Sequence, residues 1–393
     1  MVEWKKIEDL GSYFGGLTGK TKKDFEDGNA KFITYMNVFE NPSLDESTVG
    51  LVHINEGEKQ NRVQKGDVLF TGSSETPDEA GMSCVVTDDL QEDYYMNSFC
   101  FGLRLNYPEQ FNLHYLKHLL RSYSVRNAIS KTASGVTRFN ISKVRFGNIL
   151  IPIPSLAEQT RIVGILDTFT ASIENLKQQI AQRRKQYEHY RNQLLDLEGK
   201  EGNSIKCWGG FCEMVKGNGV QKVDFVESGK GCIHYGQIYT YYGSYAYSTN
   251  KFVSEKVFER AKKASYGDLI MTDTSENVED ICKTVAYLGK DDIAVSNHAL
   301  IIKHHQNPRF LSYSTQTNSF LIQKRKVVVG VKVSGIKPEH LAQIKIYLPS
   351  IEEQSCIVSI LDTFEASIAN LEQQLAQRER QYEYYRNKLL TFE

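Results

Sequence analysis

The 393-residue sequence contains no long apolar run of the kind that spans a membrane. A membrane helix requires about 20 predominantly apolar residues, and the N-terminal residues also lack the apolar core of a signal peptide. We therefore expect a cytoplasmic location. The length suits two or three domains, each with enough residues to bury its own core.

Cysteines and histidines are few, and their spacing does not suggest a metal site. The seven cysteines include no C-x₂-C pair, and the nine histidines show no H-x₃-H pattern. Such spacings are typical of zinc sites. We therefore predict reduced, mostly buried cysteines and no bound metal ion.

Catalytic signatures are missing as well. Residues 14–21 end like a phosphate-binding loop, but Phe14 stands where that motif requires glycine. Residues 106–109 do not match the Asn/Asp-Pro-Pro-aromatic tetrapeptide of adenine methyltransferases. The chain also lacks a nucleophile elbow and a convincing cluster of nuclease carboxylates. Together these absences favour a binding protein, with no catalytic residues and no cofactor of its own.

The most informative feature of the chain is a long internal repeat. The stretch that begins at Pro154 recurs at Pro349 without a gap, and about two-thirds of residues 154–195 are identical to their partners 195 positions later. Outside this block the two halves share only a skeleton, such as residues 66–69 and 267–270. Because repeats reveal the architecture of a chain, we predict four segments: divergent domains at 1–153 and 199–348, and repeated blocks at 154–198 and 349–393.

Each repeated block predicts a long helix with a heptad seam. Apolar residues recur at alternating steps of four and three, and the seam is interrupted by Arg183 in one copy and Arg378 in the other. A polar seam residue usually fixes the register. Ser155 and Ser350 are suitable N-caps, each with a glutamate three residues later that completes a capping box. The predicted seam and subunit-contact residues are Glu158, Gln159, Leu166, Phe169, Ile173, Leu176, Arg183, Glu353, Gln354, Leu361, Phe364, Ile368, Leu371 and Arg378.

Two such helices can cover each other's apolar stripe. An antiparallel pair would place the divergent domains at opposite ends, related by a pseudo-twofold axis, and each helix would span at most roughly 60 Å at about 1.5 Å per residue. The pair is then either a ruler between two domains or only a brace for the fold. The predicted fold class is α+β: two α/β domains separated by an antiparallel coiled coil. Within the domains, residues 30–38, 67–71 and 148–152 are predicted strands, and residues 113–122 a helix.

Acidic residues are absent from one long tract in each domain. Residues 110–150 and 293–338 contain no Asp or Glu but seven Lys or Arg each. A basic run alone is usually a solvated surface, but its occurrence at equivalent places suggests two faces for a polyanion such as DNA. Polar loops that could reach base edges lie in both domains. They are residues 18–23, 73–76 and 134–138 in the first domain and residues 218–222, 239–247 and 274–277 in the second. The predicted DNA contacts are Lys20, Lys22, Lys23, Ser74, Lys117, Arg121, Arg126, Lys131, Arg138, Lys143, Lys222, Tyr242, Lys303, Arg309, Lys324, Arg325, Lys326 and Lys332.

Phosphate contacts are expected at Arg138 and Lys326 in particular. Neutralising either residue should weaken DNA binding across sequences and flatten its salt dependence, because phosphate contacts carry little sequence information. Unchanged salt slopes in both variants would contradict the proposal of basic faces.

The layout resembles the specificity subunits of type I restriction-modification systems along essentially the whole chain. The resemblance rests on the Pro-x-x-x-Glu-Gln pattern at Pro154 and Pro349, on the opening pattern at residues 4–11 and on residues 66–69; residues 207–212 depart from the family's usual opening. It implies that each domain reads one half of a bipartite double-stranded DNA target and that the helices set the gap. It also implies two modification subunits that methylate adenine with S-adenosylmethionine, and two restriction subunits that use ATP and Mg²⁺.

Two other classes of protein remain open. One is a stand-alone two-domain DNA-binding or scaffold protein, in which the repeat serves stability only. The other is a self-contained methyltransferase or nuclease, which would bind S-adenosylmethionine or cut DNA with a metal ion as an isolated chain.

Overall fold

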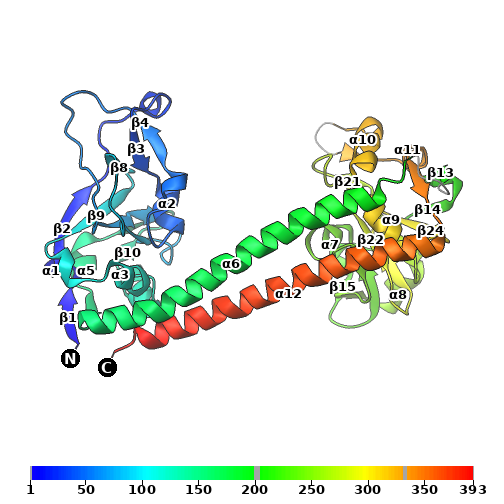
Figure 1. Ribbon diagram of the computed structural model, residues 1–393. Coiled ribbons are helices and arrows are strands. Elements are labelled where there is room, and N and C mark those ends of the chain that lie inside the picture. The colour runs from blue at the N-terminus through cyan, green and yellow to red at the C-terminus, as the bar shows by residue number, and fades with distance from the viewer. Residues whose placement is uncertain (1, 199–203, 331–333, 393) are drawn as a thin grey trace. The chain divides into compact units, whose positions relative to one another are not determined.

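The chain divides into two compact units, each built around one of the divergent domains (Figure 1). The computed structural model describes residues 2–198, 204–330 and 334–392. Unit 1 comprises residues 1–178 and 372–393, and unit 2 comprises residues 179–371. The long helices α6 (Leu156–Leu195) and α12 (Ile351–Leu389) each contribute one part to unit 1 and the other part to unit 2.

An antiparallel sheet with the strand order β2-β9-β5-β7 forms the centre of unit 1. Strands β5 and β7 are buried along their whole length. Smaller sheets have the orders β1-β12, β4-β3-β8 and β10-β11-β6. The strands are β1 (Glu3–Lys6), β2 (Gly11–Gly15), β3 (Ala30–Ile33), β4 (Gly50–Val52), β5 (Val68–Thr71), β6 (Ser73–Ser74), β7 (Ser83–Val85), β8 (Tyr94–Met96), β9 (Cys100–Leu105), β10 (Ala133–Ser134), β11 (Phe139–Ile141) and β12 (Leu150–Ile153). The helices are α1 (Ile7–Leu10), α2 (Tyr35–Glu40), α3 (Leu113–Leu119), α4 (Tyr123–Ser130) and α5 (Lys143–Gly147).

The predicted strand at residues 30–38 is wrong in its second half. The strand ends at Ile33, and Thr34 caps helix α2 by accepting a hydrogen bond from the backbone nitrogen of Asn37 at 3.1 Å. Threonine is a favoured N-cap because its hydroxyl satisfies a backbone donor that the first helical turn leaves free. The strand β5, the strand β12 and the helix α3 lie where they were predicted, to within two or three residues.

Unit 2 repeats the strand arrangement of unit 1 although the two domains differ in sequence. Its main sheet has the order β14-β24-β20-β22-β17, of which the first four strands correspond to β2-β9-β5-β7. The parallel pair β16·β23 corresponds to β3·β8, and β21·β25 corresponds to β6·β11. The strands are β13 (Ser204–Cys207), β14 (Cys212–Lys216), β15 (Phe225–Val226), β16 (Lys230–Ile233), β17 (Tyr245–Ala246), β18 (Lys251–Val253), β19 (Lys263–Ala264), β20 (Leu269–Thr272), β21 (Thr274–Ser275), β22 (Thr284–Tyr287), β23 (Ile293–Val295), β24 (Ala299–His304), β25 (Ser334–Gly335) and β26 (Lys345–Leu348). The helices are α7 (Tyr235–Thr240), α8 (Glu255–Arg260), α9 (Pro308–Ser314), α10 (Asn318–Val327) and α11 (Pro338–Leu341).

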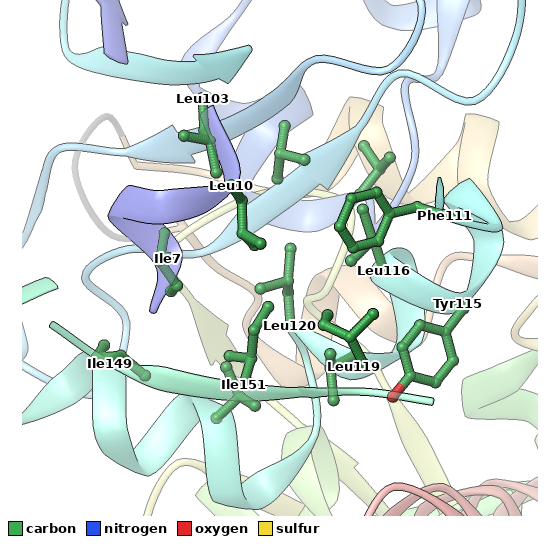
Figure 2. Packing of buried hydrophobic residues seen from close by; sticks show 14 of the residues in the cluster. Ile7, Leu10, Leu103, Phe111, Tyr115, Leu116, Leu119, Leu120, Ile149 and Ile151 are labelled. Atoms are coloured by element: carbon green, nitrogen blue, oxygen red, sulfur yellow. The ribbon is translucent and has the colours of Figure 1, made fainter. Parts of the chain in front are cut away.

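The core of unit 1 forms where helix α3 packs on the strand that precedes helix α6 (Figure 2). The hydroxyl of Tyr115 donates to the backbone oxygen of Pro152 at 3.0 Å, which joins α3 to β12. Ile162 and Leu166 of α6 are fully buried in the same cluster. The equivalent residues of α12, Ile357 and Leu361, belong to the core of unit 2. The first turns of each repeated helix are therefore part of a domain core.

The two repeated helices pack against each other in antiparallel orientation within unit 1. The ring of Phe169, in the first half of α6, stacks on the ring of Tyr385, near the end of α12, with 5.3 Å between centroids. The guanidinium carbon of Arg378 lies 5.7 Å from the centroid of the Phe169 ring. Stacked aromatic pairs and cations over rings each contribute about 0.5–1.5 kcal/mol.

The same arrangement recurs in unit 2, with every residue displaced by 195 positions. Tyr190 of α6 stacks on Phe364 of α12 at 5.3 Å, and Arg183 lies 5.9 Å from the centroid of Phe364. Each arginine that interrupts the heptad seam therefore lies over an aromatic ring of the other helix. This contact supports the prediction that the two arginines fix the register of the pair.

The predicted N-caps of the repeated helices are formed. The hydroxyl oxygens of Ser155 and Ser350 accept hydrogen bonds from the backbone nitrogens of Glu158 at 3.4 Å and Glu353 at 3.2 Å. The carboxylate of Glu158 does not complete the capping box as predicted, because it binds the guanidinium group of Arg161 at 2.7 and 2.8 Å.

Candidate nucleic-acid interface

Buried glutamines fix the start of each repeated helix to the start of a short helix inside the basic tract of its domain. The side chain of Gln159 is 0% exposed, accepts from the backbone nitrogen of Asn112 at 2.8 Å and donates to the backbone oxygen of Pro154 at 2.9 Å. Gln354 makes the equivalent bond to the backbone nitrogen of Asn307 at 3.0 Å. Asn112 and Asn307 cap helices α3 and α9. The glutamine of the repeated Glu-Gln pattern thus ties a long helix to its domain.

The substitution Gln159→Ala is expected to lower the free energy of unfolding by about 2–4 kcal/mol, because it leaves buried backbone donors and acceptors without partners. Thermal unfolding followed by circular dichroism measures the effect. Gln178→Ala is a matched control, since that side chain of the same helix is exposed and donates to the carboxylate of Glu174 at 3.1 Å. We expect a change within about 0.5 kcal/mol. Equal stability of the two variants would contradict the anchoring role.

Three cations of the basic tracts are saturated inside the fold. The guanidinium group of Arg121 donates to five backbone oxygens, at residues 38–41 and 83, over 2.6–3.3 Å. Arg126 donates to three backbone oxygens between residues 78 and 81. Lys324 donates to two, at residues 279 and 281. Burial lowers the pKa of Arg121 and of Arg126 to about 10. The prediction that these three residues contact DNA is corrected, because their donors are engaged within the fold.

Two further cations of the basic tracts bind the repeated helices. In unit 1 the ammonium group of Lys117 lies 3.1 Å from a carboxylate oxygen of Asp167, which also contacts Nε2 of His118 at 2.7 Å. Burial would raise the pKa of Asp167, but the hydrogen bond from His118 and the charge of Lys117 hold it at about 2. In unit 2 the guanidinium group of Arg309 lies 2.6 Å from the carboxylate of Asp362. Lys117 and Arg309 therefore attach α6 and α12 to their domains.

Two more predicted contacts lie inside the fold. The ammonium group of Lys20 donates to the carboxylate of Glu58 and to the backbone oxygen of His53, both at 2.6 Å. Tyr242 is 7% exposed, and its hydroxyl donates to the side chain of Asn250 at 3.2 Å. Both residues are removed from the set of predicted DNA contacts.

The remaining residues of the predicted set stay candidates for contact with DNA. Lys303 is half-buried, with its ammonium group 3.5 Å from the carboxylate of Asp268. Ser74 is buried and lines a pocket of unit 1. Lys332 lies outside the described residues. The exposed candidates are Lys22, Lys23, Lys131, Arg138, Lys143, Lys222, Arg325 and Lys326.

A pocket of about 380 Å³ opens in unit 1 between helix α2, strand β6 and the loop of the β10–β11 hairpin. The hydroxyl of Tyr35 donates to the backbone oxygen of Ser73 at 2.7 Å and fixes one wall. On another wall, Nε of Arg138 donates to the hydroxyl of Ser73 at 2.9 Å. The lining residues are Tyr35, Met36, Phe39, Ser73, Ser74, Glu75, Glu79, Thr137 and Arg138.

Unit 2 has a pocket of about 460 Å³ at the equivalent place, where helix α7 meets strand β21. The hydroxyl of Tyr239, the fifth residue of α7, donates to the backbone oxygen of Thr274 at 2.7 Å. In unit 1 the bond to the matching oxygen of Ser73 comes from Tyr35, the first residue of α2. The lining residues are Tyr235, Tyr239, Thr274, Ser275, Glu276, Asn277, Asp280, Lys283 and His298. The two pockets therefore share a backbone frame but present different side chains.

Comparison with known proteins places the chain in a family. A sequence profile described as "Type I restriction modification DNA specificity domain" matches residues 1–183 and 202–380. The chain belongs to this family. A type I restriction enzyme specificity subunit of Haemophilus influenzae is 29% identical over 304 residues, which are 73% of this chain and 74% of the relative. One of Escherichia coli is 29% identical over 269 residues, or 62% of this chain and 63% of the relative.

Solved structures share the fold of this specificity-family chain. The S subunit of a type I restriction-modification system from M. genitalium aligns with a TM-score of 0.53 and 14% identity, over 100% of this chain and 97% of that one. A chain from a structure on complex assembly and conformational transition of the type I system aligns with a TM-score of 0.64 and 16% identity, over 99% and 97%. These likenesses confirm the predicted fold class.

The sequence did not predict the ring-bearing residues that line the two pockets. The polar loops at 73–76 and 274–277 were predicted to matter, and each contributes residues to its pocket. Tyr35, Phe39, Tyr235 and His298 were not singled out. An available signal was the recurrence of a tyrosine just after the matching strands β3 and β16, two residues past Ile33 and Ile233.

The described ranges contain no group of three or more His, Cys, Asp or Glu that could hold a metal ion. Among the helices in those ranges, none is both long enough and apolar enough to cross a membrane. Cys84, Cys100, Cys232 and Cys282 are buried and free, as the sequence predicted for most of the cysteines.

Proposed function

We propose that this chain reads a bipartite double-stranded DNA target as the specificity subunit of a type I restriction-modification complex. The observation that carries the proposal is the pair of units with one strand order and matching pockets of different lining. The backbone oxygens of Phe99 and His298 accept equivalent hydrogen bonds, from Gly72 at 2.7 Å and from Asp273 at 3.1 Å. His298 lines the second pocket, whereas the ring of Phe99 packs against Arg138 of the first. A common frame with exchanged side chains suits two readers of one polymer with different local sequences.

The chemistry of the pockets suits base edges. Both combine hydroxyl and carboxylate groups with aromatic rings, and the pocket of unit 2 adds the amide of Asn277. Base edges in the major groove present donors, acceptors and the thymine methyl group. Exposed lysines such as Lys22 and Lys131 supply the sequence-independent contacts to phosphates that position a reader on the duplex.

The repeated helices suit a partner that is present in two copies. About two-thirds of residues 154–195 recur in the second copy. The recurring residues include exposed ones, such as Gln178 and Gln182 with their counterparts Gln373 and Gln377, so the two helices offer related surfaces. We assign those surfaces to two modification subunits, which methylate adenine in each half-site with S-adenosylmethionine. Two restriction subunits cleave with ATP and Mg²⁺. In this proposal the chain itself has no catalytic group or cofactor and acts in the cytoplasm, where the DNA is. Helices α6 and α12 set a fixed gap between the two half-sites.

Co-expression with a type I modification subunit in a host without adenine methylation tests this function. The methylated adenines, located by sequencing the host genome, are expected to fall in one motif of two half-sites with a constant gap. A complex that co-purifies but methylates only a contiguous motif would contradict the two-reader proposal. If the chain binds DNA but captures no modification subunit, it is a stand-alone DNA-binding protein.

A further inference from the structure

Arg138 stands apart from the other arginines of the first basic tract. Arg121 and Arg126 donate hydrogen bonds to backbone oxygens. Arg138, in contrast, is exposed and lines the pocket of unit 1. Within residues 2–198, 204–330 and 334–392, its guanidinium group has one hydrogen bond, from Nε to the hydroxyl of Ser73 at 2.9 Å. In those ranges its two terminal nitrogens have no bonded acceptor.

The position of the Arg138 side chain is fixed before any ligand binds. The guanidinium carbon lies 4.9 Å from the centroid of the Phe99 ring, and the bond to Ser73 sets its rotation. Ser73 lies on strand β6, which pairs with β11, the strand that follows Arg138. A side chain held by packing and by a hydrogen bond presents its remaining donors in one geometry, which is the requirement for bidentate recognition.

The loop that carries Arg138 is itself held in one conformation. Strands β10 and β11 are antiparallel, with Ala133 opposite Ile141 and Ser134 opposite Asn140. The turn between them begins at Gly135, which has a φ of 155°. A side chain at this glycine would meet the backbone oxygen of Arg138 at 1.9 Å. The hairpin therefore depends on glycine at this position, and it presents Val136, which is 93% exposed, at its tip.

Two carboxylates near Arg138 favour a base edge over a phosphate group as the partner of its guanidinium group. Glu75 and Glu79 line the same pocket as Arg138, and a phosphate group would be repelled by them. A base edge would not be repelled, because guanine offers the acceptors N7 and O6 to arginine while amino groups of neighbouring bases donate to carboxylates. The exposed Val136 matches the apolar contact that a thymine methyl group can make.

We propose that Arg138 is a specificity-determining residue that binds a guanine through its two terminal nitrogens, within the half-site read by unit 1. This inference rests on the proposed function and assigns to Arg138 a role in base recognition in place of the phosphate contact that the sequence suggested. Lys283 and His298 line the equivalent pocket of unit 2, so the second half-site is read by different chemistry.

Selection from a library of randomised duplexes by the full chain, assembled with modification subunits, tests the inference. Arg138→Ala is expected to lose discrimination at one guanine of one half-site by about 5- to 150-fold, with the other half-site unchanged. Arg138→Gln is expected to shift that position toward adenine, because an amide pairs with N6 and N7 of adenine. Since the residue is exposed, both variants should melt within a few degrees of the parent chain.

Lys131→Gln is the matched control, because Lys131 is an exposed cation of the same tract. It should weaken binding to all sequences and reduce the salt slope by about 1, with the motif unchanged. If Arg138→Ala and Arg138→Gln behave like this control, Arg138 binds phosphate and the inference fails. If neither variant changes the motif or the affinity, it also fails. A parent complex that selects no bipartite motif would instead overturn the proposed function.

Discussion

Replacing Arg121 by methionine is expected to lower the free energy of unfolding by about 3–5 kcal/mol. The guanidinium group satisfies five backbone oxygens that belong to helix α2, its C-terminal end and strand β7. Methionine fills a similar volume but leaves those acceptors without a donor in a partly buried site, and each unsatisfied group costs about 1–3 kcal/mol. Thermal unfolding should show a fall of roughly 2–4 °C for each kcal/mol.

Lys131→Met provides the control, since it removes one positive charge from the same acid-free tract at an exposed position. Its stability should stay within about 0.5 kcal/mol of the parent. At a temperature where Arg121→Met is folded, the salt slope of its DNA binding should equal that of the parent chain. A normal melting temperature together with a reduced slope would return Arg121 to the DNA-binding surface.

The contrast between these two residues shows what charge in a sequence can and cannot predict. Both lie in a tract without Asp or Glu, yet Arg121 supports the fold and Lys131 faces solvent. Arg121 and Arg126 of this tract bind carbonyl oxygens of segments 38–41 and 78–83, which are distant in sequence. A sequence pattern gives the number of cations in a tract but not whether each side chain points into the fold or into solvent. Several predicted DNA contacts therefore turned out to bind partners inside the fold.

The long helices were predictable because their signals are local and repeated. A heptad seam, a serine cap and an uninterrupted run of helix formers act within a few residues, and the constant offset extends to the stacked pairs Phe169–Tyr385 and Tyr190–Phe364. The role of Gln159 was not predictable in the same way, because its partners lie on helix α3 and at the helix start. The pocket of unit 1 joins α2, β6 and a hairpin about 60 residues later, so only the folded chain brings these segments together.

Removing one heptad from both repeated helices is expected to shorten the gap in the DNA target while both half-sites keep their sequences. Seven residues amount to two turns of a coiled-coil helix, so the seam stays in phase. The helix shortens by about 10 Å, which corresponds to about three base pairs. Deleting residues 176–182 and 371–377 achieves this, since it keeps the anchors Gln159 and Gln354, both seam arginines and both stacked pairs.

The methylated motif of the shortened chain, determined with its modification subunits, measures the effect. Methylation of the parent target should fall to background, and a motif with the same half-sites and a smaller gap should replace it. Deleting only four residues from each helix is the control, because it moves the apolar seam off the partner helix and should abolish the complex rather than alter the gap. An unchanged gap after the heptad deletion would mean that α6 and α12 brace the fold without measuring the DNA. Altered half-sites would mean that the pockets do not read bases independently of the helices.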